Sequence, residues 1–213
     1  MKQDGFVHPV VAVAKRGLDL LCVGAGVALT LPIWPIIALA IKLDSPGPVL
    51  FKQIRVGRAW ADRTELFWMY KFRSMRTDAE AETGPVWARK NDPRITRVGG
   101  FLRKTRLDEI PQLFNVLKGE MSITGPRPER PGICGGLEDA IPFYAERTYG
   151  VLPGITGLAQ VSQGYDESLD DVRAKLLYDH AYGLSLARPR AWLVMEAGIL
   201  WRTAATVVMG RGQ

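Results

Sequence analysis

An almost wholly apolar run, from Gly17 to Ile41, constrains this chain more than any other feature, and Asp19 is its only charge. The run is longer than the roughly 20 residues that a membrane-spanning helix needs. It is too long for the apolar core of a signal peptide, and no small-residue cleavage site closes it. The sequence therefore predicts that this segment lies in lipid.

Two prolines, Pro32 and Pro35, interrupt the middle of the apolar run. A proline inside a helix removes a backbone hydrogen bond and clashes with the preceding turn, so we expect a sharp bend near Leu31-Pro32. The arm from Gly17 to Leu31 would rise only about 22 Å, less than a hydrocarbon core of roughly 30 Å. The segment is expected either to enter and leave by one membrane face or to cross as a tilted helix with tolerated prolines.

Basic residues flank the apolar run on both sides. Lys15 and Arg16 precede it, and the cations that follow it are Lys42, Lys52, Arg55 and Arg58. Because Lys and Arg are enriched on the cytoplasmic side of membrane segments, both ends of the run are expected to be cytoplasmic.

A second stretch, from Trp192 to Met209, is apolar around most of its circumference but carries Glu196 and Arg202. Trp192 and Trp201 suit an interfacial position. The pattern fits equally a helix lying in the membrane surface and a helix packed into the protein core.

The net charge and the few cysteines and histidines limit the kinds of partner and of catalytic site that this chain can have. The 28 Lys and Arg residues exceed the 22 Asp and Glu residues and give a net charge of +6, which indicates an anionic partner: nucleic acid, a phosphorylated substrate or acidic lipid. Cys22 and Cys134 lie far apart and indicate a reducing compartment. Neither His8 nor His180 belongs to a Cys/His cluster or a triad pattern, so zinc and triad chemistry lack support.

The middle of the chain, residues 44–190, is punctuated by Gly and Pro and predicts short elements. Val49–Ile54 and Leu66–Phe72 are typical of strands, and Ser168–Tyr182 is typical of a helix capped by Ser168 or Asp170. A further helix is expected at Asp108–Lys118, ended by Gly119, with an apolar face of Leu107, Ile110, Phe114 and Leu117. A Rossmann nucleotide site is not expected, because a βαβ alternation and a phosphate-binding glycine motif are both missing from the sequence.

A dense basic stretch leads directly into an acidic pair, Asp108-Glu109; its cations are Arg94, Arg97, Arg103, Lys104 and Arg106. Guanidinium groups and helix-end N–H groups bind phosphate oxygens, so this stretch suits a diphosphate. A carboxylate held ionised in that field is suited to attack phosphorus or to ligate Mg²⁺. The alternative is structural, because Asp at a helix start is a good N-cap and Glu in the first turn complements the helix dipole.

Two weaker signals lie elsewhere. Lys71, Arg73 and Arg76 alternate with apolar residues, as in a strand that presents cations on one face, either to a ligand or to solvent. Arg127 stands between two prolines in GPRPE, and that rigidity reduces the entropy lost when the side chain binds an anion.

Long segments spread over nearly the whole chain resemble the monotopic phosphoglycosyl transferases, the bacterial sugar transferase family. In order they are KRGLDLL, IKLDSPGPVLFKQ, YKFRSM, DPRITRVGGFLRKTRLDEIPQLFNVLKGEMS, GPRPERP, PGITGLAQV, LLYDHAY and the terminal MGRGQ. Any one segment is a weak signal, but chance does not produce this many segments in the family's order and spacing.

The resemblance implies an α/β membrane-associated fold. An N-terminal region, residues 1–43, would hold a re-entrant membrane helix broken at Leu31 and Pro32. Residues 44–213 would form a compact, mainly helical catalytic domain with a few short strands and an amphipathic C-terminal helix at the interface. The implied location is the cytoplasmic face of the bacterial inner membrane.

The resemblance also implies a reaction. In the family, the Asp of the Asp-Glu pair attacks the β-phosphate of a UDP-sugar and expels UMP. The phosphosugar then passes to polyprenyl phosphate, with Mg²⁺ as cofactor. Asp108 would thus be nucleophile and metal ligand, and Glu109 its acid/base or positioning partner. Substrate binding would fall to residues in the family's other motifs: Arg103, Lys71, Arg127, Gln160 and Asp179.

Two departures from the family pattern affect these expectations. Many relatives have Ser before the proline at the helix break, where this chain has Leu31. The segment Gln163–Val172, QGYDESLDDV, replaces a shorter sequence and leaves the uridine- and sugar-contacting residues there unassigned. Longer relatives carry a further multi-span N-terminal region, which this sequence does not contain.

Two other functions stay open at this stage. One is a membrane-associated protein that binds anionic lipid or nucleic acid through the basic stretch, although nucleic acid is not the expected partner. The other is a glycosyl transferase that moves the sugar without its phosphate and releases UDP. The sugar, the glycan pathway and the oligomeric state, including a homodimer, are not determined by the sequence.

Overall fold

The computed structural model describes residues 6–81, 84, 92–164 and 168–209, and it is a mixed helix and strand fold, as predicted. Two helices come first, α1 (Pro9–Thr30) and α2 (Trp34–Asp44), joined by the 3-10 turn η1 (Leu31–Ile33). The elements that follow are β1 (Leu50–Ala59), β2 (Thr64–Phe72), α3 (Arg97–Lys104), η2 (Leu107–Gln112), α4 (Leu113–Lys118), β3 (Ser122–Thr124), α5 (Pro131–Ala140), η3 (Tyr144–Thr148), β4 (Gly154–Thr156), α6 (Leu158–Ser162), α7 (Leu169–Ser185) and α8 (Pro189–Val208).

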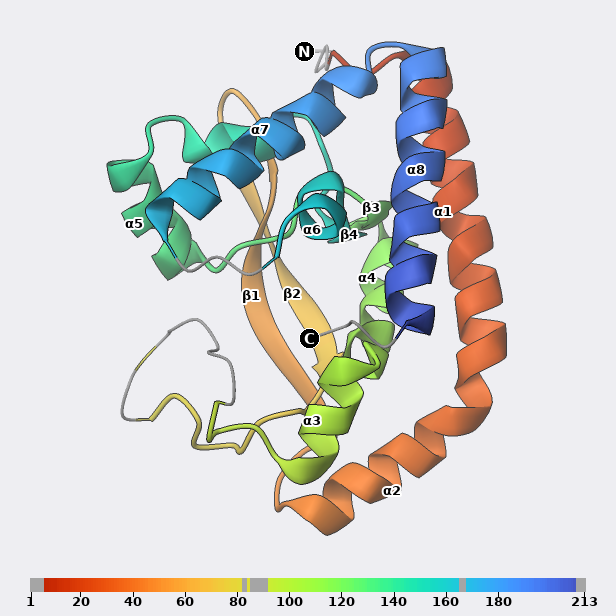
Figure 1. The fold of residues 1–213 in the computed structure, drawn as a ribbon, viewed down its shortest axis with the longest axis vertical. Helices are drawn as coiled ribbons and strands as arrows, with labels where there is room; N and C mark the ends of the chain where they lie inside the picture. The colour runs from red at the N-terminus through yellow and green to blue at the C-terminus, as the bar shows by residue number, and fades with distance from the viewer. Residues whose placement is uncertain (1–5, 82–83, 85–91, 165–167, 210–213) are drawn as a thin grey trace.

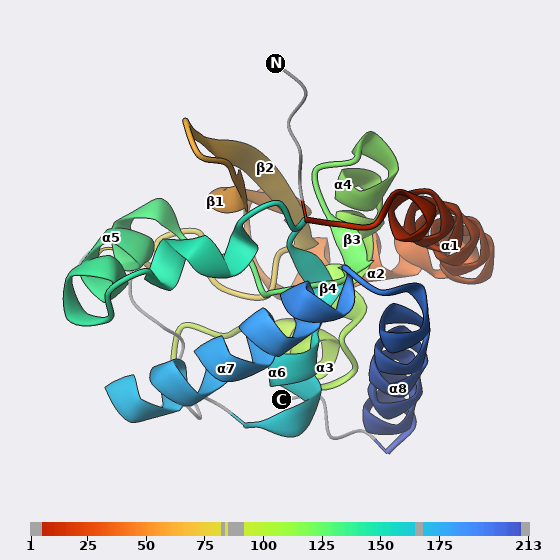
Figure 2. The same cartoon turned by 90° about the horizontal axis from the view of Figure 1, so that it is seen from above.

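The elements form a central hairpin with helices around it. Figure 1 shows α1 and α8 side by side along one edge, with β1 and β2 in the middle and α2 running beneath them. Seen from above, α5 lies at the end of the molecule opposite α1 and α8 (Figure 2). The predicted division at residues 43/44 would fall at the end of α2, and it stays a prediction.

The bend in the apolar segment lies at the proline pair. Regular α-helix stops at Thr30, and Pro32 cannot donate the backbone hydrogen bond that would continue it. The side chain of Thr30 relieves the break: its Oγ1 donates to the Gly26 carbonyl at 2.7 Å and accepts from Trp34 Nε1 at 3.1 Å. Thr30 thus supplies a hydroxyl next to the position where many relatives have Ser.

The two predicted strands are confirmed, and β1 extends beyond the predicted Ile54 to Ala59. They pair antiparallel, with Phe51 opposite Lys71 and Ile54 opposite Trp68. Among the described residues the only other sheet is the short parallel pair of β3 and β4. Gly154 permits this second pairing, because a Cβ there would lie 2.1 Å from the Gly125 nitrogen.

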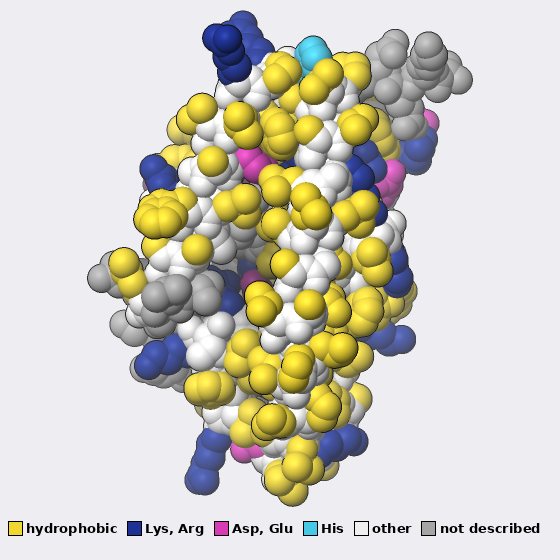
Figure 3. Space-filling view, turned by 90° about the vertical axis from the view of Figure 1, so that its right-hand side faces the viewer, with side chains coloured by type: hydrophobic (Ala, Val, Ile, Leu, Met, Phe, Trp, Pro, Cys, Tyr) yellow, Lys and Arg dark blue, Asp and Glu magenta, His cyan; other side chains and the backbone are white. Residues whose placement is uncertain are grey.

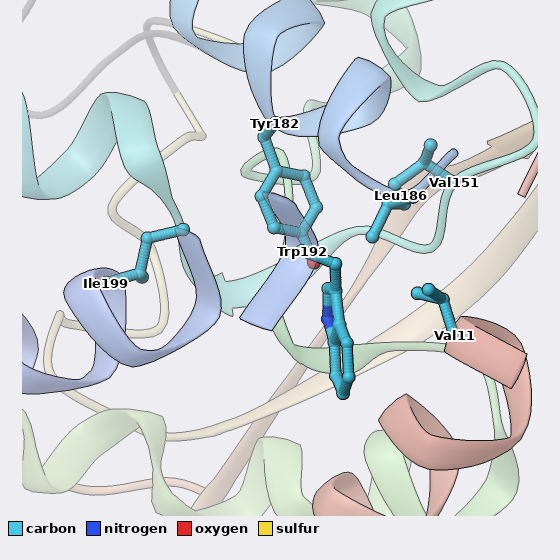
Figure 4. Packing of buried hydrophobic residues seen from close by; sticks show 6 residues of the cluster. All are labelled: Val11, Val151, Tyr182, Leu186, Trp192 and Ile199. Carbon is cyan, nitrogen blue, oxygen red and sulfur yellow. The ribbon is translucent and has the colours of Figure 1, made fainter. Parts of the chain in front are cut away.

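One stripe of α1 packs against the rest of the protein. Its buried residues recur every four positions: Val11, Lys15, Asp19 and Val23. Val11 belongs to a core cluster shared with α7 and α8, whose other members are Val151, Tyr182, Leu186, Trp192 and Ile199 (Figure 4). This cluster fixes the N-terminal half of α1 to the core.

A buried polar network lies beside this cluster. Lys15 Nζ forms an ion pair with Glu196 Oε1 at 2.9 Å and donates to Thr124 Oγ1 at 2.7 Å. Asp19 accepts hydrogen bonds from Ser122 Oγ and from the Ile123 backbone N–H. The buried charges of α1 are therefore satisfied by groups from β3 and α8, as buried charges require.

The opposite side of α1 and α8 is apolar and uncovered. Figure 3 shows hydrophobic side chains gathered along both helices, and Leu21, Leu29, Val194 and Trp201 are each more than 70% exposed. Among the described residues, Pro9–Asp44 is the one helical segment long and apolar enough to cross a membrane, and an 18-residue window of it has a mean hydropathy of 2.1 and little burial. A soluble protein rarely exposes so large an apolar surface without a partner.

Two sequence expectations need correction. Asp108–Lys118 is not one α-helix but the 3-10 turn η2 followed by α4, because Pro111 inside the turn cannot donate a backbone hydrogen bond. Its expected apolar face is only half buried: Leu107 and Ile110 pack on a core cluster, whereas Phe114 and Leu117 are exposed.

The two cations that precede the apolar run both bind the rest of the protein. Lys15 pairs with Glu196, and Arg16 donates to the carbonyls of Val116 and Leu117 at the end of α4.

Other expectations hold. The helix predicted at Ser168–Tyr182 is α7, and Ser168 caps it in a reciprocal capping box with Asp171. The C-terminal helix is α8, which is both core-packed and apolar outside: Trp192 and Glu196 are buried, and Trp201 is exposed. Cys22 and Cys134 are free thiols.

Replacing Lys15 by Met should strongly destabilise the protein. The change leaves the Glu196 carboxylate buried without its cation, and breaking one side of a buried pair costs about 3–5 kcal/mol. Chemical denaturation of the purified protein measures the loss. The double variant K15M/E196Q removes both charges and should recover most of it; an equally unstable double variant would show that the ion pair is not the cause.

Candidate active site

A cavity of about 500 Å³ opens between the β1–β2 hairpin, the loop that follows β2, and the segment from α3 to η2. Among the described residues, four carboxylates line it, and so do ten basic residues: Arg55, Lys71, Arg73, Arg76, Arg94, Arg103, Arg106, Arg127, Arg130 and Lys175. Such a concentration of cations in a concave site suits a polyanionic ligand.

Asp108 reaches this cavity through a strained turn. Arg106 adopts the left-handed conformation with φ of 59°, which a side chain rarely accepts, and the chain then turns into η2. Nearby, α3 can approach the end of β2 only because residue 99 is glycine; a Cβ there would lie 2.0 Å from the Ser74 carbonyl oxygen. Local backbone geometry thus carries the acidic pair into the cavity.

The Asp108 carboxylate is buried and free. The residue is 5% exposed, and within the described part of the chain its side chain forms neither a hydrogen bond nor an ion pair. It does not cap η2, whose N-cap is Arg106 without a side-chain hydrogen bond. The capping interpretation of Asp108 is therefore wrong.

Glu109, in contrast, is surrounded by cations from three segments. Its Oε1 lies 2.9 Å from Lys71 Nζ and 3.4 Å from Arg127 Nη2, and its Oε2 lies 3.7 Å from Arg106 Nη1. Lys71 comes from β2, Arg127 from the loop after β3, and Arg106 from the turn before η2. Glu109 therefore joins the parts of the cavity wall to one another.

The pKa values of the two neighbouring carboxyls, Asp108 and Glu109, shift in opposite directions. Burial, reinforced by the charge of Glu109, raises the pKa of Asp108 above its ordinary value despite Lys71, Arg103 and Arg106. Burial would also raise the pKa of Glu109, but Lys71, Arg127 and Arg106 together hold it well below its ordinary range. Nearby cations favour the ionised form of Asp108, as expected from the sequence, but burial and the charge of Glu109 oppose them.

Lys71 lies at the centre of the site. Burial lowers its pKa, although Glu109 opposes that shift by favouring the charged form. The Lys71–Glu109 distance of 2.9 Å and the depressed pKa of Glu109 both fit an ionised pair.

Arg103 and Gln160 also line the cavity. Gln160 comes from α6, where its Nε2 donates to the Ile155 carbonyl at 3.0 Å. Its Oε1 is buried with no hydrogen-bond partner among the described residues.

Asp179 lies outside the cavity. It is 2% exposed and pairs with Arg147 at 2.8 Å, and Arg147 Nη2 donates to the backbone carbonyl of Arg127 at 2.7 Å. Asp179 thus acts on the site through Arg147 and the Arg127 loop rather than by touching a ligand. Of the expected substrate-binding residues, four line the cavity and this one does not.

Other cavity residues were not singled out from the sequence for this role. Arg55 projects from β1 beside Gln53, and its buried Nε lacks a partner among the described residues. Arg130 pairs with Glu80 across the cavity wall. Because alternate residues of a strand share a face, the sequence could have placed Gln53 and Arg55 together on the cavity side of β1.

Two further expectations concern Arg73 and the segment Gln163–Val172. Arg73 does not line a solvated face, because its guanidinium is buried and donates to the carbonyls of Ser45 and Pro46 after α2. In the segment Gln163–Val172, Gln163 and Gly164 line the cavity, and residues 165–167 lie outside the described part of the chain.

The donor set fits a shared Mg²⁺ site rather than a prebuilt one. Within the described residues there is no group of three or more Asp, Glu, His or Cys side chains suited to a metal. Mg²⁺ commonly binds through one or two carboxylates together with substrate phosphates and water. In such a site the unpaired Asp108 carboxylate, which lies beside a wall of cations, would supply the protein ligand.

Comparison with known proteins places the chain in a family. Residues 10–210 match the profile described as bacterial sugar transferase. An Aeromonas hydrophila UDP-N-acetylgalactosamine-undecaprenyl-phosphate N-acetylgalactosaminephosphotransferase is 43% identical over 96% of this chain and 46% of its own length. The exopolysaccharide production protein PSS of Rhizobium leguminosarum bv. phaseoli is 40% identical over 94% of this chain and 98% of its own length.

A third relative is a UDP-glucose:undecaprenyl-phosphate glucose-1-phosphate transferase of Xanthomonas campestris pv. campestris, 44% identical over 79% of this chain and 34% of its own length. The chain therefore spans less than half of the Aeromonas and Xanthomonas proteins and nearly all of the Rhizobium protein.

Replacing Asp108 by Asn should raise the Tm at neutral pH. Because burial raises the folded-state pKa of Asp108 above its unfolded value, the wild type has its full stability below the unfolded pKa, about 3.9, and loses some as pH rises through the folded pKa. The neutral amide avoids that loss. Thermal unfolding at several pH values should show the advantage of D108N at neutral pH and its disappearance in acid; a lower Tm of D108N at neutral pH would contradict the raised pKa.

Proposed function

Because this chain belongs to the bacterial sugar transferase family, we propose that it transfers a sugar 1-phosphate from a UDP-sugar to undecaprenyl phosphate. The observation that carries the proposal is the buried, unpaired carboxylate of Asp108 in a cavity lined by cations. The relatives' names supply the reaction class, since they describe transfer from UDP-sugars to undecaprenyl phosphate. The product would begin a glycan such as an exopolysaccharide, an O-antigen, a capsule or a glycoprotein glycan.

The reaction proceeds in two displacements at one phosphorus. An oxygen of ionised Asp108 attacks the β-phosphorus of the UDP-sugar, the bond from that phosphorus to the bridging oxygen breaks, and UMP leaves with both electrons. A phosphate oxygen of undecaprenyl phosphate then attacks the same phosphorus and releases the Asp108 carboxylate. A covalent intermediate divides one difficult transfer into two easier steps.

The cavity cations bind and orient the diphosphate. Lys71, Arg103 and Arg127 line the cavity with Asp108, and cationic donors offset charge that develops on phosphoryl oxygens. Their charge also favours the ionised form of Asp108, which burial opposes. The side chain of Gln160 adds a neutral polar group to the cavity wall.

Glu109 acts as a positioning residue in this scheme. Three cations depress its pKa, so at neutral pH it carries no proton to donate. Its ion pairs with Lys71 and Arg127 hold two phosphate-binding side chains beside Asp108. This supports positioning over acid/base work.

Asp108 would hold Mg²⁺ jointly with the diphosphate oxygens. When bound, Mg²⁺ neutralises phosphate charge and polarises the reacting group.

The packing of the apolar segment supports a re-entrant path. The N-terminal half of α1 packs on the core through Val11 and Lys15, and α2 packs on it again through Ile37 and Ile41. Because both arms contact one catalytic core, both ends of the segment belong on the side of the membrane where that core lies. We place the core at the cytoplasmic face of the inner membrane, where UDP-sugars are made, with the bend at Leu31 and Pro32 in lipid.

The proposed reaction predicts UMP release that depends on Asp108. Purified protein with Mg²⁺, undecaprenyl phosphate and a panel of UDP-sugars should release UMP with at least one donor. D108N should lower the rate by at least about a thousandfold, as loss of a nucleophile does in other enzymes. D170N is the matched control, because Asp170 is exposed and pairs only with Arg173 among the described residues.

The outcomes separate the competing functions. Release of UDP instead of UMP would indicate transfer of the sugar without its phosphate. Absence of either product with every donor would favour a binding protein, and full activity of D108N would refute the covalent mechanism.

The re-entrant path predicts that the N-terminus and the core share one membrane side. In a variant with Cys22 and Cys134 replaced by Ser, single cysteines are placed before Met1 or at the exposed Asp170. Both should resist a membrane-impermeant maleimide in spheroplasts and react in inverted vesicles. Labelling of the N-terminal cysteine alone in spheroplasts would establish a spanning helix.

A further inference from the structure

An apolar groove of about 600 Å³ runs along α8, separate from the catalytic cavity. One face of α8, including Val194 and Gly198, forms its length, and Leu158 of α6 contributes to its wall. Arg190 and Arg202 stand at its two ends, about 18 Å apart along the helix. The groove is thus a long apolar strip with a cation at each end.

The floor of the groove is open at Gly198. A Cβ built there would meet no atom within 4 Å, so this position has unused space. Val194 beside it is 75% exposed, which leaves the apolar strip uncovered in the described structure.

Both arginines are available to an anion. Neither forms an ion pair with a carboxylate of the described residues, and Arg202 Nη1 makes only a long hydrogen bond of 3.4 Å to Ser162 Oγ. An apolar strip with free guanidinium groups at its ends matches an anionic amphiphile, whose chain lies on the strip and whose phosphate meets a guanidinium.

The Arg202 end adjoins the catalytic cavity. Helix α6 contributes Leu158 to the groove and Gln160 to the cavity, so the two sites share this helix. Arg202 contacts Ser162 at the end of α6, and the next residues, Gln163 and Gly164, line the cavity. A lipid in the groove would therefore have its charged end beside the cavity at Arg202 and not at Arg190.

We propose that this groove holds the isoprenoid chain of the polyprenyl phosphate acceptor, with its phosphate toward Arg202 and the catalytic cavity. The assignment rests on the proposed transfer reaction for the identity of the lipid. A bulk phospholipid would also match an apolar strip with a guanidinium at its end, but Arg202 contacts α6, which supplies Gln160 to the cavity, and this position favours a lipid whose phosphate reacts there. The rest of the long isoprenoid chain extends into the surrounding lipid.

The test measures acceptor binding without turnover. Displacement of a fluorescent polyprenyl phosphate from protein in detergent is followed with unlabelled polyprenyl phosphates of long chain and of two isoprene units. G198L fills the groove and, since its Cβ meets open space, leaves the fold intact. It should weaken long-chain binding by at least about tenfold, which the loss of two buried CH₂ groups suffices to produce, and leave short-chain binding within about twofold.

Removing the guanidinium should act differently. R202A is expected to weaken binding of both chain lengths by about tenfold, because both carry the phosphate. Two matched controls lie outside the groove: L193F adds bulk to an exposed position of α8, and R188A removes an exposed charge just before it. Both should bind the two acceptors as wild type does.

Two results would overturn the assignment: unchanged long-chain binding in G198L, or an equal loss for long and short chains. A loss in G198L that added phospholipid reverses would assign the groove to membrane docking and would also overturn it. Single-turnover UMP release without acceptor separates this inference from the proposed function. Normal release with unaltered acceptor binding in G198L refutes the groove alone, whereas chain-length-dependent binding without any UMP release supports the groove and refutes the transfer.

Discussion

Glu109 is a buried carboxylate whose desolvation is offset only by cations that arrive from three separate segments of the chain. Lys71, Arg106 and Arg127 meet at this one side chain, so the hairpin, the turn into η2 and the loop after β3 are fixed relative to one another. Leaving any of these charges unpaired in a buried position would be costly. The position and the chemistry of Asp108 both depend on this arrangement. Glu109 forms the ion pairs with these cations, and the neighbouring Asp108 carboxylate forms none among the described residues.

A second set of polar contacts supports the loop that carries Arg127. Asp179 neutralises Arg147, and Arg147 holds the backbone of Arg127, whose side chain then reaches Glu109. Asp179 is thus linked to the proposed nucleophile through a chain of charged contacts, without lining the cavity. In the sequence, a residue that supports the cavity wall, such as Asp179, looks like a residue that lines the cavity, because both occur in motifs of the same family. Only the three-dimensional structure distinguishes the two.

The sequence predicts local features well and tertiary partnerships poorly. The bend at Leu31-Pro32, the two strands and the capping box of Ser168 follow from the chemistry of proline, β-branched residues and short hydroxyl side chains. The raised pKa of the Asp108 carboxyl does not, because it arises first from burial in the folded structure and then from the charge of Glu109 beside it. The buried ion pair of Lys15 with Glu196 was not predicted either, because the two residues are 181 positions apart in the sequence.

That separation bears on how the protein is made. During synthesis α1 leaves the ribosome first, yet Glu196, Ser122 and Ile123, which satisfy Lys15 and Asp19, emerge more than a hundred residues later. On the proposed re-entrant path, a helix with two unmatched charges would enter hydrocarbon unfavourably, so we expect the nascent segment to stay at the bilayer surface until its partners arrive. Insertion of its apolar side and completion of the core would then be one event, and a chain truncated before α8 would lack Glu196, the partner that Lys15 needs in its buried position.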